Sequence, residues 1–400
     1  MLTLASVRAA RERIRDAIYV SPCAHTSTLS ERLGCELYLK LENLQMSGSF
    51  KERGARNRLV MLEGAARGKG VVAASAGNHA QGVAHHAREL GIDATIVMPR
   101  STPLGKVAST KRFGARVVLH GGGYDEAAAE ARRLGDREGR TFIHPFDDEL
   151  VMAGQGTLGL ELLEQVPDLD AVVLPVGGGG LLAGVAVALK EQHPNVAVYG
   201  VEPEAVPSMR EALGAGEPVQ LPGARTLADG IAVGRVGDRP FEVARRYVDA
   251  MVTVTDEDLA EAILVLLEEE KTVAEAAGAA ALAALLGGRL PVRGRRMVAV
   301  VSGGNIDVNI LSRIIDRGLM KSGRMMRLRV VLRDEPGQLA WLLALLADRS
   351  ANVMQIRHDR AEAGVDVTRT AVELVLETRG FEHVAEIRQA LDREGLDRLE

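Results

Sequence analysis

The chain is short of the residues that mark several classes of protein. Cys23 and Cys35 are its only cysteines, which are too few for a disulfide scaffold and point to a reducing compartment. Acids and bases are interspersed and give a formal charge of −5, whereas a nucleic-acid-binding protein would present a basic face. No apolar run approaches the roughly 20 residues that a membrane-spanning helix needs, and the N-terminal residues 4–17 read as a charged amphipathic helix. We therefore expect a soluble, cytoplasmic protein that binds neither nucleic acid nor membrane.

Lysine and aromatic residues are also scarce. Aromatics make up 3% of the 400 residues, so the core must be built from Ala, Val, Leu and Ile. One of the few lysines, Lys51, lies in the glycine- and serine-rich run 47–54, directly before a helical pattern. A lysine in a small apolar pocket loses its proton easily, because burial disfavours the ammonium form, and can then act as a nucleophile or form a Schiff base. The alternative is an ordinary helix-start lysine in solvent.

Short apolar strands alternate with longer helical patterns from about residue 70 onward. This order indicates an α/β fold, with parallel sheets covered on both faces and ligands bound at the carboxyl ends of the strands. The expected strands are 71–74, 94–98, 117–119, 171–174, 196–199 and 297–301, and the expected helices include 124–134, 181–192 and 256–285.

The pattern changes near residue 320. A linker at 321–326 is followed by a strand (326–332), a turn (334–337), a helix (338–348), two strands (352–359 and 369–377) and a helix (382–394). Only residues 396–400 remain for a last strand. The βαββαβ order is that of a ferredoxin-like domain.

Three loops that follow strands are rich in small residues. Residues 75–79 (Ser-Ala-Gly-Asn-His) lead into a helix, where exposed N–H groups suit a carboxylate, although Ser and Asn are also ordinary helix caps. Residues 177–180 are four glycines between a buried strand and a helix. Such a loop can wrap a phosphate closely, and a merely flexible loop is the alternative. In the third loop, 302–305, Ser302 is placed either to bond a ring nitrogen or to cap the next helix.

Taken together, these motifs resemble those of the fold-type II enzymes (tryptophan synthase beta-like) that use pyridoxal 5′-phosphate. The runs SGSFKERGA (47–55), SAGNHAQG (75–82), PVGGGGLLAG (175–184) and VSGGN (301–305) are similar to those of the threonine dehydratases, or threonine ammonia-lyases. The run DEPGQL (334–339) resembles the start of the ACT regulatory domain that some of them carry. The resemblance implies a two-subdomain catalytic unit at 1–320, with a smaller subdomain at about 50–148, and an ACT domain at 327–400.

The resemblance also assigns roles to single residues. Lys51 would form the Schiff base and serve as the catalytic base, with Phe50 packed beside the cofactor. Asn78 would bond the ring hydroxyl and Ser302 the pyridine nitrogen. The phosphate would be held by Gly177, Gly178, Gly179, Gly180 and Leu181. The substrate carboxylate would be bound by Ser75, Ala76, Gly77, Asn78 and His79.

The implied reaction is the conversion of L-threonine to 2-oxobutanoate and ammonia, with serine as a poorer substrate that gives pyruvate. A neutral hydroxyl at Ser302 does not stabilise a pyridinium as a carboxylate would, which fits β-elimination better than transamination. Serine racemases of this family carry a second serine where this chain has Ala76. Alanine cannot relay a proton, so we expect dehydration without racemisation.

A metal site is weakly supported. Relatives with a divalent ion use a glutamate followed six residues later by an aspartate, and here Glu202 is followed by Ser208. One carboxylate is a thin ligand set for Mg²⁺ or Ca²⁺, which leaves a monovalent cation as the option.

The tail suggests regulation. By resemblance, an effector such as isoleucine or valine would contact Gly337, Gln338, Leu339 and Asn352, with the enzyme a homodimer or homotetramer. A structural role for the tail is the alternative. The competing functions are a serine dehydratase or racemase, or a β-replacement synthase, of the same fold, and a catalytically silent amino-acid sensor. The sequence does not separate isoleucine biosynthesis from threonine breakdown.

Overall fold

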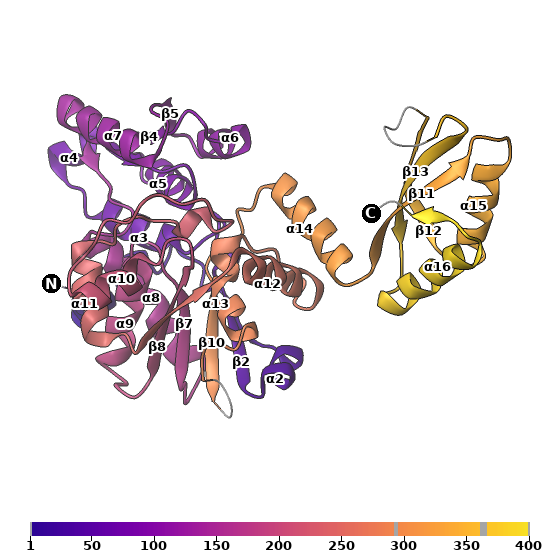
Figure 1. Ribbon diagram of the computed structural model, residues 1–400. Coiled ribbons are helices and arrows are strands. Elements are labelled where there is room, and N and C mark those ends of the chain that lie inside the picture. Colours follow the sequence, from indigo (N-terminus) through magenta and orange to yellow (C-terminus); the bar gives the residue numbers. More distant parts are fainter. Residues whose placement is uncertain (1, 292–294, 361–365, 399–400) are drawn as a thin grey trace. The chain divides into compact units, whose positions relative to one another are not determined.

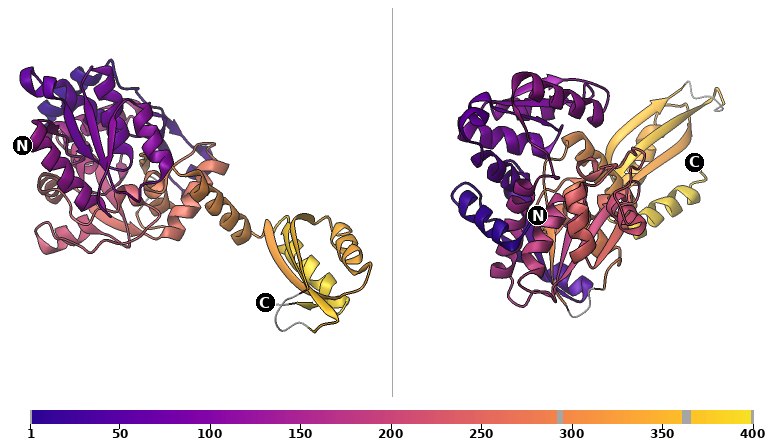
Figure 2. Two further views of the ribbon diagram at one scale, coloured as in Figure 1. Left: turned by 90° about the horizontal axis from the view of Figure 1, so that it is seen from above. Right: turned by 90° about the vertical axis from the view of Figure 1, so that its left-hand side faces the viewer.

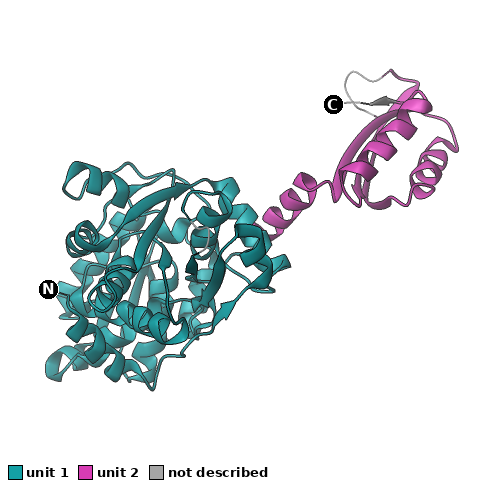
Figure 3. Cartoon of the chain, turned by 90° about the horizontal axis from the view of Figure 1, so that it is seen from below, with its two compact units in different colours: residues 1–307 teal, residues 308–400 magenta. Residues whose placement is uncertain are grey.

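The computed structural model describes residues 2–291, 295–360 and 366–398. The chain divides into two compact units, residues 1–307 and 308–400 (Figure 3). No helix among the described residues is both long enough and apolar enough to cross a membrane.

Unit 1 contains a six-stranded sheet in the order β1-β2-β10-β7-β8-β9 (Figure 1). All neighbouring strands in it are parallel except the β1/β2 pair. Its strands are β1 (Cys23–His25), β2 (Glu36–Leu41), β7 (Ala171–Pro175), β8 (Ala197–Pro203), β9 (Ala250–Val254) and β10 (Arg296–Val301). Because β7 and β10 are neighbours, the loops that follow them meet at one edge of the sheet.

The two faces of this sheet are covered by different kinds of helix. Val172, Leu174, Val298 and Val300 share a core with the apolar residues of α8 and α9. The other face meets α13, whose alanines allow close approach. The helices of this part are α1 (Leu4–Ile14), α2 (Ser27–Leu33), α8 (Glu149–Gln165), α9 (Gly180–Lys190), α10 (Ser208–Ala215), α11 (Asp238–Tyr247), α12 (Asp256–Glu268) and α13 (Ala276–Leu286), with short 3-10 turns at Glu42–Leu44 and Asp229–Ile231.

A second sheet of unit 1 is fully parallel, in the order β5-β4-β3-β6. It belongs to the purple part of the chain in Figure 2. Alternate residues of β3 face opposite sides, as the period of a strand requires. Val71 and Ala73 pack against α5, and Val72 and Ala74 pack against α7. The elements are α3 (Lys51–Val60), α4 (Gly64–Lys69), β3 (Val71–Ala74), α5 (Asn78–Glu89), β4 (Ala94–Met98), α6 (Leu104–Arg112), β5 (Arg116–Leu119), α7 (Tyr124–Glu138) and β6 (Thr141–Phe142). The predicted α/β architecture with parallel sheets is confirmed.

One predicted helix is wrong in extent. Residues 256–285 form two helices, α12 and α13, separated by residues 269–275. Lys271 in this segment has a left-handed backbone with φ of 54°, which a continuous right-handed helix cannot contain. The break matters, because it places Glu275 at the start of α13.

Unit 2 starts with α14 (Val308–Lys321) and continues as an antiparallel sheet in the order β12-β13-β11-β14. The remaining elements are β11 (Met325–Arg333), α15 (Gln338–Ala347), β12 (Asn352–Asp359), β13 (Arg369–Glu377), α16 (Phe381–Arg393) and β14 (Asp397–Arg398). Residues 321–326 comprise the end of α14, a turn and the start of β11. The predicted βαββαβ order is confirmed, including a short last strand, while residues 399–400 lie outside the described residues.

Candidate active site

Lys51 begins α3, and its position is fixed by the loop before it. Residues Ser49 and Gly303 form an isolated antiparallel bridge. The Phe50 N–H donates to the Ser302 carbonyl at 3.1 Å, and the Gly304 N–H donates to the Gly48 carbonyl at 2.9 Å. The loop that carries the lysine is therefore joined to the loop that follows β10.

The Lys51 amine points into the protein. Nζ donates to the Pro145 carbonyl at 3.2 Å and lies 5.1 Å from the centre of the Phe50 ring. Burial lowers the pKa of this amine to about 8, and the negative charge of Glu275 offsets part of that effect. A large fraction of Lys51 is thus neutral and nucleophilic near pH 8, which an ordinary surface lysine is not.

Lys40 gives a useful contrast. Its amine is fully buried but donates to Glu161 at 2.6 Å and to the Ser21 carbonyl at 2.8 Å. Of these two lysines, Lys40 has a carboxylate at hydrogen-bond distance, whereas the hydrogen bond of Lys51 goes to a neutral carbonyl.

The glycine loop lies between β7 and α9 and fits tightly against its surroundings. A Cβ on Gly178 would lie 2.3 Å from the Phe146 ring, and one on Gly179 would lie 2.7 Å from Met209. Gly179 also has φ of 92°, which favours glycine. The first N–H groups of α9 have no intrahelical partners, so they are suited to an anion.

The lysine and the glycine loop meet through one short segment. Pro145 accepts the hydrogen bond from Lys51, and the next residue, Phe146, contacts Gly178 and Gly180. This arrangement fits a cofactor that carries both an aldehyde and a phosphate. The side-chain-free cradle and the buried amine are the observations that support that fit.

Asn78, the first residue of α5, is held at both ends of its amide. Its Oδ1 accepts from Asn305 Nδ2 at 2.7 Å, and its Nδ2 donates to the Glu275 carboxylate. Asn305 Nδ2 also donates to the Ser47 carbonyl at 2.8 Å. The loop after β3 and the loop after β10 are therefore linked through Asn78.

The remaining residues of the loop after β3 take local roles. Ser75 Oγ accepts from the Gly77 N–H at 3.1 Å. The His79 ring is buried and hydrogen-bonded to the Ile143 carbonyl at 3.0 Å. Burial lowers the pKa of His79 to about 3, and the nearby Lys51 charge adds to the effect. The loop therefore offers a carboxylate its N–H groups and not a charged imidazole.

Ser302 follows β10 and is 3% exposed. Its hydroxyl donates to the Ala277 carbonyl on α13, with a long separation of 3.4 Å. Such a weak bond leaves the hydroxyl free to rotate toward a better partner.

Glu202 is occupied as a helix cap. Its carboxylate accepts from the N–H groups of Met209 and Arg210, at 2.6 and 2.9 Å, at the start of α10. Burial raises the pKa of Glu202 to about 7, although these two bonds act in the opposite direction. Among the described residues, no cluster of three or more His, Cys, Asp and Glu side chains could hold a metal ion.

The candidate regulatory residues divide into two groups. A cavity of about 450 Å³ in unit 2 is lined by Gly337, Gln338 and Leu339, together with Arg333 and His358. Asn352 is not among the lining residues, and its side chain donates to Glu377 at 3.1 Å.

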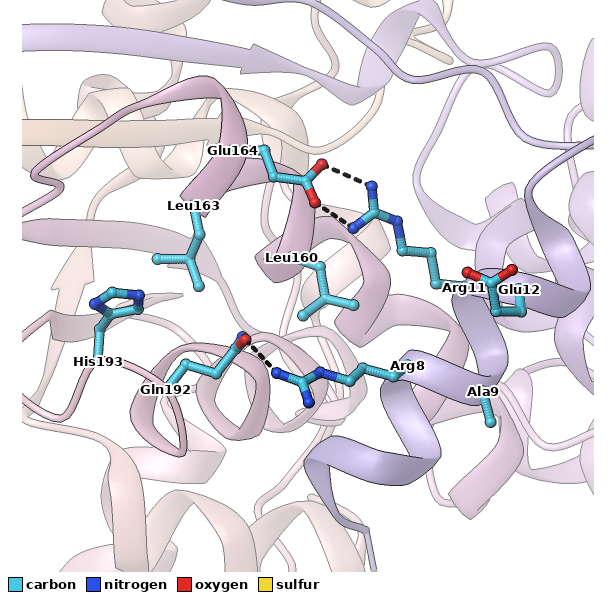
Figure 4. A pocket seen from close by; sticks show the side chains of 9 residues that line it. All are labelled: Arg8, Ala9, Arg11, Glu12, Leu160, Leu163, Glu164, Gln192 and His193. Carbon is cyan, nitrogen blue, oxygen red and sulfur yellow. Dashed lines mark hydrogen bonds and ion pairs between the residues drawn. The ribbon is translucent and has the colours of Figure 1, made fainter.

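A further cavity of about 540 Å³ lies away from the strand ends, between α1, α8 and the segment after α9 (Figure 4). Leu160 and Leu163 line it together with two polar pairs, Arg8 with Gln192 and Arg11 with Glu164. It contains none of the predicted site residues.

Several residues of the site were missed from the sequence. Glu275, Asn305 and Phe146 contact the predicted residues directly. Asn305 lies in the run 301–305 and could have been found there, whereas no local motif marks Glu275 or Phe146.

Comparisons with known proteins agree with this geometry. The family described as "Pyridoxal-phosphate dependent enzyme" matches residues 14–303. An L-threonine ammonia-lyase from Thermotoga maritima is 48% identical over 397 residues, which is 99% of each chain. The structure of threonine deaminase isoform 2 from Solanum lycopersicum has a TM-score of 0.75 at 40% identity and covers 78% of this chain and 86% of that one. Maize serine racemase also gives a TM-score of 0.75, at 33% identity, with coverages of 80% and 98%.

Proposed function

The chain belongs to the family of pyridoxal-phosphate dependent enzymes, and from this premise we propose that it is an L-threonine ammonia-lyase. Its reaction converts L-threonine to 2-oxobutanoate and ammonia, and L-serine to pyruvate as a secondary activity. The similarity to an ammonia-lyase along the whole chain supports this assignment. The observation that carries it is the buried amine of Lys51 beside a glycine cradle.

When bound, pyridoxal 5′-phosphate supplies an aldehyde that bonds amines and a ring that withdraws electrons from the substrate Cα. Lys51 would provide the amine that bonds this aldehyde, and the same nitrogen would take the Cα proton of the substrate as general base. Residues 177–180 and the N–H of Leu181 would hold the phosphate. Asn78 would donate to the ring hydroxyl, and Ser302 would bond the ring nitrogen without charging it. The N–H groups of residues 75–79 bind the substrate carboxylate.

The test is an assay of 2-oxo acid release from threonine and from serine, with no second substrate. The wild-type protein should be yellow with cofactor and should turn over threonine faster than serine. Lys51→Ala should lose both the colour and turnover, and Lys111→Ala, at an exposed position, serves as the control for loss of a lysine elsewhere in unit 1. Absence of 2-oxo acid from either substrate alone, with a β-substituted amino acid formed once a thiol is added, would refute the lyase assignment in favour of a β-replacement enzyme.

We further propose that residues 327–400 form an ACT domain joined to the catalytic residues 1–320 through 321–326. The cavity at Gly337–Leu339 is the proposed site of an amino-acid effector, with isoleucine or valine first. An effector acts only if it binds one conformational state more tightly than another. Threonine titrations with and without isoleucine or valine test this, and superimposable curves would remove it.

Two assignments complete the proposal. The enzyme is a homodimer or homotetramer, which light scattering on the purified chain measures.

A monovalent cation near Glu202 would make turnover higher in K⁺ than in a large organic cation at equal ionic strength. Equal rates in the two salts would argue against the cation.

A further inference from the structure

Glu275 lies at the start of α13 but does not cap that helix with its side chain. Its backbone N–H donates to the Gly303 carbonyl at 3.1 Å, and its carboxylate accepts from Asn78. The residue is only 8% exposed. A Cβ on Gly303 would lie 2.4 Å from Glu275 Oε1 and 3.0 Å from Asn78 Nδ2. The glycine therefore makes room for this carboxylate-to-amide contact inside the site.

A chain of hydrogen bonds fixes which way the Asn78 amide points. It starts at the Ser47 carbonyl, which can only accept, so the Asn305 atom that faces it is Nδ2. That same nitrogen faces Asn78, so the Asn78 atom there is the acceptor Oδ1. The opposite end of the Asn78 amide is then Nδ2, and it needs an acceptor, which Glu275 supplies. An ionised carboxylate accepts and cannot donate, so a flipped Asn78 would lose both bonds.

We propose that Glu275 is a positioning residue of the active site, which fixes the Asn78 amide so that its second N–H is presented to the cofactor. It does not itself touch the reacting atoms. The amide nitrogen of Asn78 has two N–H groups, and Glu275 uses one. The second is the donor that the proposed function assigns to the ring hydroxyl, so this part of the inference depends on that function.

Several charged groups act on Glu275. Burial raises its pKa to about 7, the bond from Asn78 and the charges of Lys106 and Lys51 lower it, and Asp229 raises it. Lys106 and Asp229 are themselves paired, with 2.7 Å between Nζ and Oδ2. In return, the Glu275 charge raises the pKa of Lys51. The protonation of Glu275 and that of Lys51 are therefore coupled at about pH 7 to 8.

Two substitutions separate the contact of Glu275 with the Asn78 amide from the effect of the Glu275 charge on Lys51. Glu275→Gln keeps an acceptor oxygen for Asn78 and removes the charge. Glu275→Asp keeps the charge and shortens the side chain by one methylene, which withdraws it from Asn78. Both are made in the full-length chain. Lys51 is titrated in cofactor-free protein by the pH dependence of labelling with an amine-selective reagent, read by mass spectrometry, with exposed Lys111 as the internal standard.

In Glu275→Gln the pKa of Lys51 should fall by about one pH unit, the size expected when a nearby opposite charge is removed. In Glu275→Asp it should stay near its wild-type value. After reconstitution with pyridoxal 5′-phosphate, the pH at which the visible band changes should move measurably in Glu275→Asp, by up to about one pH unit, as expected for one lost hydrogen bond. Glu202→Gln is the matched control, a second buried glutamate whose loss should not move the Lys51 titration.

The inference is overturned if neither substitution moves either titration. It is also overturned if both substitutions lower the melting temperature and shift the Lys51 titration and the visible-band titration by the same amounts. A residue with a purely structural role would give that result. The Lys51 titration needs no substrate, so it stands or falls independently of whether threonine is turned over.

Discussion

Arg53 lies two residues after Lys51 on α3 and is fully buried between two glutamates. Its guanidinium donates to Glu42 at 2.7 and 2.8 Å and to Glu161 at 2.5 and 2.8 Å. Burial alone would lower the pKa of Arg53, but the two carboxylates raise it overall. Likewise, burial raises the pKa of Glu42, but Arg53 outweighs that and holds it below its usual value. Both shifts favour the ionised forms of Arg53 and Glu42 at neutral pH.

Replacing Arg53 with Met should destabilise unit 1 strongly. Methionine leaves Glu42 and Glu161 buried with only Lys40 to compensate, and removing one partner of a buried ion pair costs about 3–5 kcal/mol. Unfolding entropy of about 2.1 cal/mol/K per residue gives about 0.65 kcal/mol/K over the 307 residues of unit 1. The melting temperature should therefore fall by about 5–8 °C.

The control is Arg11→Met, because Arg11 makes the same two-bond contact with Glu164 on the surface, where the side chains are 37% and 57% exposed. Its loss should change stability by about 1 kcal/mol or less. Thermal and urea unfolding of both variants supply the comparison. Equal effects would refute the reasoning that burial, and not the contact itself, sets the magnitude.

The difference in stability between the wild type and Arg53→Met should change with pH in one direction. In the wild type, the depressed pKa of Glu42 contributes stability that is present above the usual glutamate value of 4.5 and is lost as the pH falls through the lowered value. In the variant, the unpaired carboxylates are relieved by protonation. The gap between wild type and Arg53→Met should thus shrink from pH 7 toward pH 4, and a constant gap would contradict the assignment of the loss to ionised carboxylates.

Three further outcomes are expected. The pKa of Lys51 is lowered to about 8. The rate at which cofactor-free enzyme bonds added pyridoxal 5′-phosphate should therefore rise about tenfold per pH unit between pH 6 and 7 and level off above pH 8. A rise that continues to pH 10 would indicate an ordinary lysine. Gly178→Ala places a Cβ 2.3 Å from Phe146, so it should cost about 1–3 kcal/mol of stability and weaken cofactor binding in a fluorescence titration. The control is Gly214→Ala, where a Cβ meets nothing within 4 Å, and it should have neither effect. With alanine at position 76, chiral chromatography of long incubations with L-serine should find no D-serine, and its rapid appearance would refute the proton-relay argument.

The fold could be predicted well where the local pattern and the tertiary role agree. Continuous apolar runs such as 71–74 and 297–301 are strands buried on both faces. The tail was predicted almost residue by residue, because β11 and β13 alternate apolar and polar residues over one helix-covered face. The two-residue strands β6 and β14 carry too little pattern to be recognised alone. The β2 strand was missed although Leu37, Leu39 and Leu41 alternate in it.

The candidate site was predictable only as far as its motifs reach. Lys51, Asn78, Ser302 and the glycine loop lie in runs with a chemical reason to be small or polar, and the structure brings these runs together at adjoining strand ends. Glu275 lies 197 positions from its partner Asn78. Nothing in its own neighbourhood separates it from the acidic run 268–270 just before it. Only the break between α12 and α13, forced by the left-handed backbone at Lys271, turns this glutamate into the site.

Lys40 and Lys51 show why the surrounding charges decide the chemistry. Lys40 and Arg53 share a core with Glu42 and Glu161, so two basic groups face two acidic ones at hydrogen-bond distance. Lys51 lies beside that cluster in sequence but has only a carbonyl at 3.2 Å and a more distant carboxyl that itself resists ionisation. The two amines therefore differ in their partners: Lys40 donates to a carboxylate, whereas burial without such a contact lowers the pKa of Lys51 to about 8 and leaves it able to bond an aldehyde.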